Sequence, residues 1–457
     1  MNNAASSASF SSSSGAFSPG MREPLDNDVL RSLIDLRRGV IDRRIFWDQG
    51  IYELELERVF ARCWLFVAHE SQVAAPGDFV TTYMGEDGVI VARGEDGEVH
   101  VFLNSCTHRG NKVSYAEAGN KRRFTCNYHG WSFGTDGALV GMPGEEYYRN
   151  TCPDFDKGEL GLHRARVQSY KGLVFATFDE QSPSLDAYLG DYRWYLDVML
   201  DNDEGGTEFL EGNIKSRMRC NWKLPAENFA GDSYHAAWTH NSGAVAMLGQ
   251  GVGKSDQEKS YQMNINGHGW QFGLDMIGNA LVLGEQDIID YLRSREEKVA
   301  ARLGKIRSRM VGAISSATLF PNLSFLPGHS TFRTWQPKGP HEMELNTWVL
   351  VNKSAPEALK DKYRKGVMRT FSPSGTLEMD DGENWEGASQ SSAGVVTRRQ
   401  KLHYGLGMGS EVAHEELKGS LHLRKYNDSN QRAFYGRWLE LMCNEGAPLA
   451  GAAGKRS

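Results

Sequence analysis

The sequence has no excess of basic residues, because 51 Lys and Arg stand against 58 Asp and Glu, for a formal net charge of −7. A nucleic-acid-binding surface normally needs such an excess, so we expect no nucleic-acid partner. No run of about 18 apolar residues occurs, so we expect no membrane span. The first twenty residues are rich in Ser and lack the basic start and apolar core of a secretory signal. We therefore expect a disordered tail over residues 1–27 and a cytoplasmic protein.

Cysteine is also scarce, with six residues among 457. So few cysteines in so long a chain exclude a disulfide-stabilised scaffold, and in a reducing compartment paired cysteines are better interpreted as metal ligands. Only Cys106 and Cys126 have histidines at ligand spacing. The remaining composition, 40% hydrophobic and 24% charged, is that of a globular protein long enough for two or three domains.

The residue patterns predict an α+β fold with a small all-β part. A helical N-terminal segment is expected over 28–62, and charge-rich or Pro-initiated helices over 287–310 and 356–371. Strands are expected at 79–83, 89–92, 99–103 and 172–178 in the small part, and at 318–325, 331–335 and 343–351 in one antiparallel sheet of the larger part. The Gly-rich stretch 241–285 fits either a lid or channel wall, or a plain surface excursion.

A four-ligand metal motif lies in the small part, where Cys106-x-His108 is followed, after seventeen residues, by Cys126-x-x-His129. Two candidates fit two thiolates and two imidazoles: Zn²⁺, and a [2Fe–2S] cluster in which two His replace two Cys on one iron. Zinc fingers usually place two Cys on one element and two His on another. Here each loop supplies one of each, which favours the cluster, with structural zinc as the alternative.

A second set of possible ligands lies at His235 and His240, with Asp232 three residues before the first. Residues five apart on a regular helix are separated by roughly 140°, so both imidazoles can reach one metal only if the helix breaks. Asn228, Asp232 and His235 follow one helical stripe, so we expect a helix that presents His235 and then breaks to bring His240 back. Two histidines and a carboxylate would form the facial triad of a non-haem iron oxygenase, and spacing alone leaves Asp232 open as the carboxylate.

The segments CTHRG, beginning at Cys106, and CNYHGWSF, beginning at Cys126, resemble the Rieske motif of the α subunits of aromatic-ring-hydroxylating dioxygenases. This resemblance extends from about residue 30 to the C-terminal helix. It implies a Rieske [2Fe–2S] domain over 63–178, inserted in a catalytic domain that is formed by 28–62 and 179–457. The antiparallel sheet of that catalytic domain would be flanked by helices.

The resemblance also assigns roles around the iron. The segment Glu378 to Trp385 matches the family's distant carboxylate segment, which makes Asp381 the third ligand, with Asp380 as the alternative. Asp232 would then hydrogen-bond His129 of the partner subunit in a head-to-tail trimer. The resemblance implies this trimer because the two metal centres of one chain would be too far apart for fast electron transfer. Asn228 would lie near the iron.

By the same resemblance, the substrate pocket is lined by Phe229, Ser233, Ala236, Phe371 and Leu377. No Lys or Arg occurs between Leu224 and Gly253, and a carboxylated substrate usually requires an arginine clamp. We therefore expect a neutral (polycyclic) aromatic hydrocarbon. Substrates like phthalate or salicylate stay open, since Arg333, Arg369 or a loop residue could reach the pocket from elsewhere.

The implied activity is cis-dihydroxylation of an aromatic ring with O₂ at a mononuclear Fe(II). Electrons would come ultimately from NAD(P)H through a reductase, with or without a ferredoxin, and a small β subunit would complete an α₃β₃ hexamer. Three alternatives remain: a monooxygenase of the same superfamily, an electron-transfer Rieske protein and a zinc-stabilised binding module.

Overall fold

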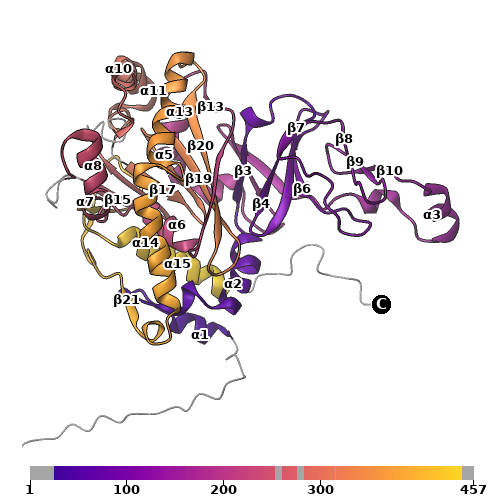
Figure 1. Ribbon diagram of the computed structural model, residues 1–457, viewed down its shortest axis with the longest axis horizontal. Helices are drawn as coiled ribbons and strands as arrows, with labels where there is room; N and C mark the ends of the chain where they lie inside the picture. The colour runs from indigo at the N-terminus through magenta and orange to yellow at the C-terminus, as the bar shows by residue number, and fades with distance from the viewer. Residues whose placement is uncertain (1–24, 253–259, 275–281, 314, 445–457) are drawn as a thin grey trace, which may run out of the picture.

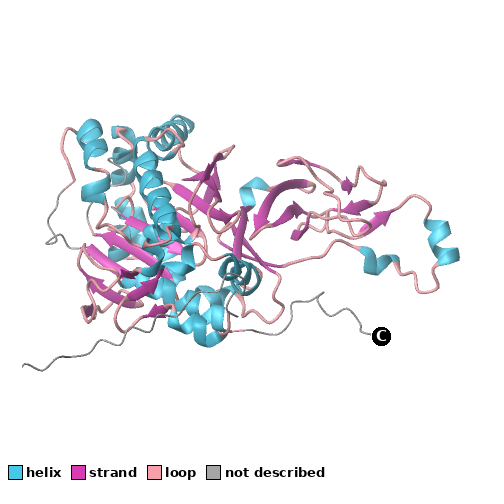
Figure 2. Cartoon of the chain, turned by 60° about the horizontal axis from the view of Figure 1, so that its bottom comes forward, coloured by secondary structure: helices cyan, strands magenta, loops and turns pink. Residues whose placement is uncertain are grey.

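The computed structural model describes residues 25–252, 260–274, 282–313 and 315–444, and it confirms the predicted α+β class. A β-rich part, from which helix α3 (Glu145–Thr151) projects, extends sideways from a larger part that contains most of the helices (Figures 1 and 2). Among the described residues, no helix is both long and apolar enough to cross a membrane. Residues 1–24 of the predicted tail lie outside the described residues. The predicted tail ends too late, at 27, because Asp26 caps helix α1 and the helix begins at Asn27.

Small antiparallel sheets form the β-rich part. One has the order β6-β5-β4-β7, a second β10-β9-β8, and a third, β11-β12-β3, connects to the larger part. The strands are β3 (Leu65–His69), β4 (Asp78–Met84), β5 (Asp87–Arg93), β6 (Val99–Leu103), β7 (Ala118–Asn120), β8 (Arg123–Thr125), β9 (Ser132–Gly134), β10 (Leu139–Gly141), β11 (Arg166–Tyr170) and β12 (Leu173–Thr177). All four strands predicted from the sequence in this part are present as β4, β5, β6 and β12.

A ten-stranded antiparallel sheet forms the centre of the larger part, in the order β13-β20-β19-β18-β17-β16-β15-β23-β22, with β14 paired to β20. Its strands are β13 (Thr207–Phe209), β14 (Ile214–Met218), β15 (Ser260–Ile265), β16 (His268–Gly273), β17 (Ser315–Leu319), β18 (Leu323–Leu326), β19 (Thr331–Pro337), β20 (Met343–Asn352), β22 (Glu411–Val412) and β23 (Ser420–Leu423). The predicted strand 318–325 is wrong as one element, because it contains the turn between β17 and β18.

Helices flank this sheet, as predicted. They are α4 (Leu185–Leu189), α5 (Tyr192–Leu200), α6 (Lys223–Phe229), α7 (Ala236–Thr239), α8 (Asn241–Leu248), α10 (Gln286–Ser294), α11 (Glu296–Leu303), α12 (Lys305–Ser308), α13 (Glu357–Phe371), α14 (Thr376–Ala393) and α15 (Ser429–Cys443). Pro356 caps α13, where a proline start was predicted. The expected helix over 287–310 is divided into three short helices, and Gly304, at a φ of +88°, separates the last two.

Two further predictions from sequence are wrong. The N-terminal segment is not helical throughout: α1 (Asn27–Ser32) and α2 (Gln49–Glu55) enclose a hairpin, β1 (Ile34–Asp35) and β2 (Val40–Asp42), to which β21 (Lys401–His403) adds a third strand. The stretch 241–285 is not a plain loop, because it contains α8 and the hairpin β15–β16, while 253–259 and 275–281 lie outside the described residues. Asn266 and Gly267 turn this hairpin with φ of 51° and 84°, the conformation that an Asn-Gly pair favours.

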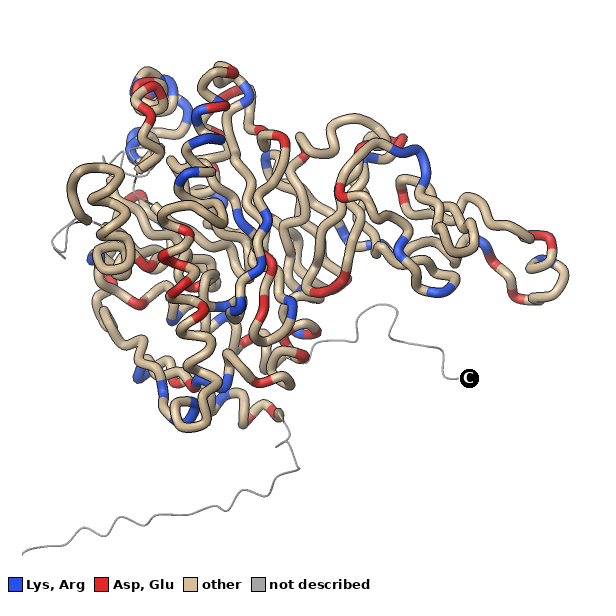
Figure 3. The backbone as a smooth tube through the Cα atoms, viewed as in Figure 1, with Lys and Arg blue, Asp and Glu red and all other residues tan. Residues whose placement is uncertain are grey.

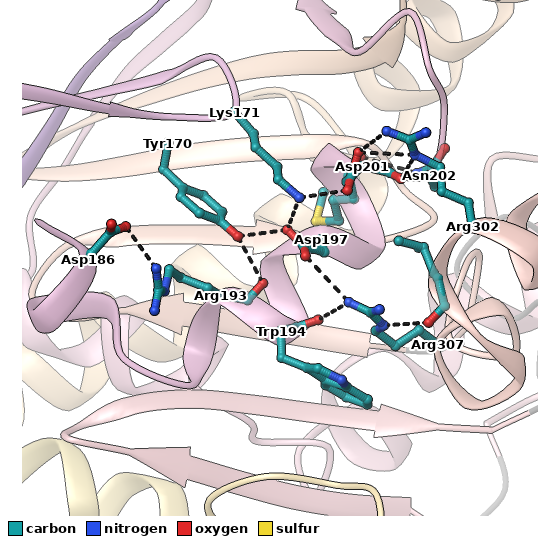
Figure 4. A network of polar contacts seen from close by, with 12 residues as sticks. Tyr170, Lys171, Asp186, Arg193, Trp194, Asp197, Asp201, Asn202, Arg302 and Arg307 are labelled. Atoms are coloured by element: carbon teal, nitrogen blue, oxygen red, sulfur yellow. Dashed lines mark hydrogen bonds and ion pairs between the residues drawn. The ribbon is translucent and has the colours of Figure 1, made fainter.

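A network of ion pairs connects the turn between β11 and β12 to the helices of the larger part (Figure 4). At the turn between β11 and β12, the Lys171 ammonium lies 2.7 Å from Asp197 and 2.6 Å from Asp201, both near the end of α5. Arg302 and Arg307, from α11 and α12, pair with the same two aspartates. The network joins the β11–β12 turn and α5 to α11 and α12, which lie about 100 residues further along the sequence.

Candidate metal centres

The two loops that carry Cys106 and Cys126 have the same backbone design. Cys106 accepts a hydrogen bond from Gly110 N–H at 2.8 Å and donates to Asn111 O at 2.8 Å. Cys126 accepts from Gly130 N–H at 2.9 Å and donates to Trp131 O at 2.8 Å. Both glycines have positive φ, 74° and 77°, which lets each loop turn back tightly after its histidine.

The four predicted ligands meet where these loops face each other. Cys106 and Cys126 are buried and not in disulfides, and the rings of His108 and His129 are 4.5 Å apart. Trp131 stacks on His108, with ring centroids 4.8 Å apart and planes inclined by 6°. Nδ1 of His108 is buried without a hydrogen-bond partner, an unfavourable state that coordination to a metal ion would relieve. The donor set therefore fits a cluster that takes one Cys and one His from each loop.

His235 and His240 flank the short helix α7, and the predicted position of the helix break is wrong. Helix α6 ends at Phe229, before Asp232 and His235, so no single helical stripe carries Asn228, Asp232 and His235. Gly231 causes the earlier break: its φ is +144°, and a Cβ there would lie 2.5 Å from Gln262 Oε1. The histidines then stand at the two ends of one helical turn, so their rings can converge.

Asp381, in helix α14, completes this group. Its Oδ1 lies 3.4 Å from His235 Nε2 and 3.2 Å from His240 Nε2, and the two Nε2 atoms are 3.2 Å apart. One ligand atom from each residue lies within 4.8 Å of the others, a spacing suited to one metal ion. Two imidazole nitrogens and a carboxylate facing a common point form the donor set of a facial iron site.

The charged side chains in this group shift one another's pKa values. Burial alone would lower the pKa of His235, but Asp232 and Asp381 hold it well above its ordinary value. Burial alone would raise the pKa of Asp381, but His240 and His235 hold it well below its ordinary value. The site thus favours an ionised carboxylate with positive charge beside it, which a bound cation would supply.

Two further carboxylates face the other ring nitrogens. Asp232 Oδ2 lies 3.4 Å from His235 Nδ1 and accepts a hydrogen bond from Asn228 Nδ2 at 3.1 Å. Asp380 Oδ2 lies 3.5 Å from His240 Nδ1. Asp381, not Asp380 or Asp232, therefore lies in the three-residue group. Asp380 and Asp381 are neighbours in the acidic helix α14 (Figure 3). Asp381 faces the Nε2 atoms of the two histidines, whereas Asp380 faces Nδ1 of His240.

The residues predicted to line the pocket are only partly brought together. Phe229 and Phe371 are buried and both pack on Arg333, whose guanidinium carbon lies 5.0 and 4.4 Å from their ring centroids. Leu377 is buried in α14. Ser233 donates its hydroxyl to Lys425 O at 3.1 Å, and Ala236 begins α7.

Sequence reasoning missed the partner of Arg333. The guanidinium is fully buried and pairs with Glu378 at 2.7 Å. Glu378 stands one helical turn before Asp381 in α14, and this i, i+3 spacing is the signal that could have linked it to the site. Burial raises the pKa of Glu378 to about 7, while Arg333 acts to lower it.

The fold and both centres define a Rieske-type non-haem iron oxygenase. Two family models match: "Ring hydroxylating alpha subunit (catalytic domain)" over 185–442 and "Rieske [2Fe-2S] domain" over 63–163. The chain belongs to the family of ring-hydroxylating dioxygenase α subunits, which are oxidoreductases. It carries a Rieske [2Fe–2S] domain and an iron-dependent catalytic domain, so the electron-transfer and zinc-module alternatives are wrong.

Known relatives cover nearly the whole chain. The α subunit of chlorobenzene dioxygenase from Cupriavidus sp. (strain PS12) is 41% identical over 90% of this chain and 93% of its own. The α subunit of biphenyl 2,3-dioxygenase from Rhodococcus jostii (strain RHA1) is 40% identical over 91% and 92%. The crystal structure of a naphthalene 1,2-dioxygenase mutant bound to phenanthrene superposes with a TM-score of 0.85, at 34% identity over 91% and 95%.

Proposed function

We propose that this chain is the terminal oxygenase subunit that cis-dihydroxylates a neutral aromatic hydrocarbon. The convergence of His235, His240 and Asp381 on one point carries the proposal, because three ligands on one face leave coordination positions open for O₂ beside the substrate. The similar proteins are named for chlorobenzene, biphenyl and naphthalene, and all three compounds are neutral rings.

In this proposal, Cys106, His108, Cys126 and His129 hold the [2Fe–2S] cluster, and His235, His240 and Asp381 hold Fe(II). When bound, the cluster supplies electrons and the iron activates O₂. The protein positions these groups. Asp232 and Asp380 accept hydrogen bonds from the Nδ1–H groups of the two iron-binding histidines, which leaves each Nε2 free to coordinate.

The substrate side of the iron is proposed to be apolar. Phe229, Phe371 and Leu377 are buried beside the ligand-bearing helices, and with Ser233 and Ala236 they are the expected lining. Neither arginine considered as an anion clamp is unpaired: Arg333 pairs with Glu378, and Arg369 donates to Leu283 O. A dry aromatic wall favours a neutral ring and excludes water from the reacting oxygen.

Electron transfer is proposed to cross between two copies of the chain. Figure 1 shows β8 and β9, which flank the second cysteine loop, and α7 toward opposite ends of the molecule. Exposed aromatic side chains stand beside both centres, with Tyr128 59% and Trp238 62% exposed, as at protein interfaces. Asp232 is 31% exposed, so its carboxylate can also meet His129 of the partner subunit.

The proposed assembly is a head-to-tail trimer that binds a small β subunit as α₃β₃ in the cytoplasm. A reductase, with or without a ferredoxin, would deliver electrons from NAD(P)H. The relatives' designation as α subunits supports a second type of subunit. A closed ring of three copies uses one heterologous contact three times, so each cluster would meet one neighbouring iron.

The test supplies ¹⁸O₂ to the reconstituted enzyme with naphthalene, phenanthrene or biphenyl, and separately with benzoate, phthalate or salicylate. We expect a cis-dihydrodiol that carries two labelled oxygen atoms from at least one neutral hydrocarbon. A singly labelled phenol as the primary product would instead support a monooxygenase. Turnover of the carboxylates alone would keep the chemistry and contradict the substrate class.

A further inference from the structure

The guanidinium of Arg333 is buried among aromatic residues next to the proposed iron-binding group. Arg333, in β19, is fully buried, and its guanidinium carbon lies 4.4 Å from the Phe371 ring and 5.0 Å from the Phe229 ring. Both phenylalanines belong to the expected substrate wall. The charge is therefore placed directly behind the surface that would contact the ring of the substrate.

Glu378 neutralises this cation from the helix that carries Asp381. Its Oε2 lies 2.7 Å from Arg333 Nη1, and the side chains are 2% and 0% exposed. The pair is not fully satisfied, because Glu378 Oε1 and Arg333 Nε are buried without hydrogen-bond partners. Removing one member of such a pair leaves an uncompensated charge in a medium that screens it poorly.

We propose that the Arg333–Glu378 pair determines substrate charge selectivity. Glu378 cancels the positive charge of Arg333 behind the Phe229–Phe371 wall, so the site prefers neutral aromatic rings and rejects aromatic carboxylates. The proposal rests on the proposed function for the location of the substrate. It assigns Glu378 a role distinct from metal binding: without its charge, the same cavity would attract a carboxylated ring.

The test compares the holoenzyme with a Glu378→Gln variant. This change keeps the shape of the side chain and removes the charge that balances Arg333. We expect the dissociation constant of labelled benzoate, measured by equilibrium dialysis, to fall about tenfold, as expected for a nearby unscreened charge. The ratio of kcat/KM for benzoate to that for naphthalene should rise by a similar factor.

Arg333→Met removes the cation and serves if Glu378→Gln does not fold. Without Arg333, burial keeps Glu378 protonated, so benzoate should gain no affinity over the parent, and a gain would contradict the inference. The double variant Arg333→Met/Glu378→Leu removes both charges and should restore the parent ratio, since buried pairs can often be replaced by apolar residues. Glu383→Gln, an exposed position on the same helix, is the matched control and should leave the ratio unchanged.

An unchanged benzoate affinity in folded, iron-loaded Glu378→Gln would overturn the inference, as would a double variant that binds benzoate as tightly as Glu378→Gln. Failure of the proposed function has a different signature. In that case the parent enzyme oxidises no neutral hydrocarbon, while the dialysis still reports whether Glu378 controls anion binding.

Discussion

The Nδ1 atom of His235 lies 3.4 Å from the Asp232 carboxylate, on the side of the ring opposite the shared metal point. His240 repeats the arrangement with Asp380 at 3.5 Å. A carboxylate behind a ligating imidazole fixes its tautomer and raises its basicity. The two histidines of the proposed iron site thus face separate carboxylates from separate segments, which leads to different predictions for the neighbours Asp380 and Asp381.

Asp380→Asn should weaken iron binding without abolishing it. The amide cannot stabilise the His240 Nδ1–H as a carboxylate does, so the affinity for Fe(II) should fall by about 10- to 100-fold. Titration of the iron-depleted catalytic site with Fe(II) measures this, with the cluster absorption as an internal reference. Wild-type affinity in the variant would contradict an orienting role for Asp380.

Asp381→Ala should remove mononuclear iron binding altogether, because a ligand is lost and two histidines alone hold Fe(II) poorly. The visible spectrum of the cluster should be unchanged. Metal analysis together with absorption separates the two centres. If Asp381→Ala retains iron and Asp380→Ala loses it, the ligand assignment must be exchanged between the two aspartates.

Cys126→Ser should abolish the cluster, since the four-ligand site then keeps only one of its two thiolates. The loss of visible absorption in the purified protein measures this. Cys152→Ser is the control, because Cys152 is an exposed cysteine at the end of α3 and belongs to neither loop. If the parent protein were colourless, the cluster would be absent and the proposed electron path would fail.

Local motifs were predictable from the sequence where ligands lie a few residues apart. The paired Cys and His spacings indicated two loops, and short β-rich runs located β4, β5, β6 and β12. The Asn266-Gly267 turn was also readable, but the surrounding Gly-rich composition obscured a hairpin of the central sheet. All six residues of β16 are buried, so the strand lacks the polar–apolar alternation that marks a half-exposed strand in a sequence.

Relations between distant segments could not be predicted from residues alone. The pairing of Arg333 with Glu378 depends on how β19 meets α14, and no local pattern encodes that contact. The chain after α6 is held by distant residues, because Asn430 and Gln262 donate side-chain hydrogen bonds to the carbonyls of Ala230 and Gly231. The place of Asp381 in the three-residue group was predicted only from the family resemblance, because Asp381 lies far along the sequence from both histidines.

Glu55→Gln should destabilise the catalytic part strongly. Glu55 and Lys223 are both fully buried and 2.5 Å apart, and Glu55 also accepts hydrogen bonds from the indoles of Trp222 and Trp438. The variant leaves the Lys223 charge buried without a counter-charge, at a cost of about 3–5 kcal/mol.

Urea unfolding followed by tryptophan fluorescence measures this change. The control is Asp361→Asn, which breaks the exposed Lys365–Asp361 pair and should leave the unfolding free energy nearly unchanged. Equal losses in both variants would show that burial of the Glu55 pair does not determine its contribution.

His268 should make the catalytic part less stable as the pH falls below neutrality. Its Nδ1 accepts the Phe320 N–H at 3.0 Å, and its Nε2 donates to Tyr188 O at 3.2 Å, so the ring is held neutral. Burial lowers its pKa to about 4. The unfolded chain titrates near 6.5, so between about pH 6.5 and 4 only the unfolded state takes up this proton.

The His268 contribution to the unfolding free energy should therefore be complete above about pH 6.5 and decline by about 3 kcal/mol as the pH falls to 4. Urea unfolding at a series of pH values measures the slope. His268→Gln removes the titrating group, so its unfolding free energy should depend less on pH over this window, although its stability at neutral pH is lower. Parallel pH profiles for parent and variant would show that His268 already protonates in the folded state, and that its bond from Phe320 does not hold the ring neutral.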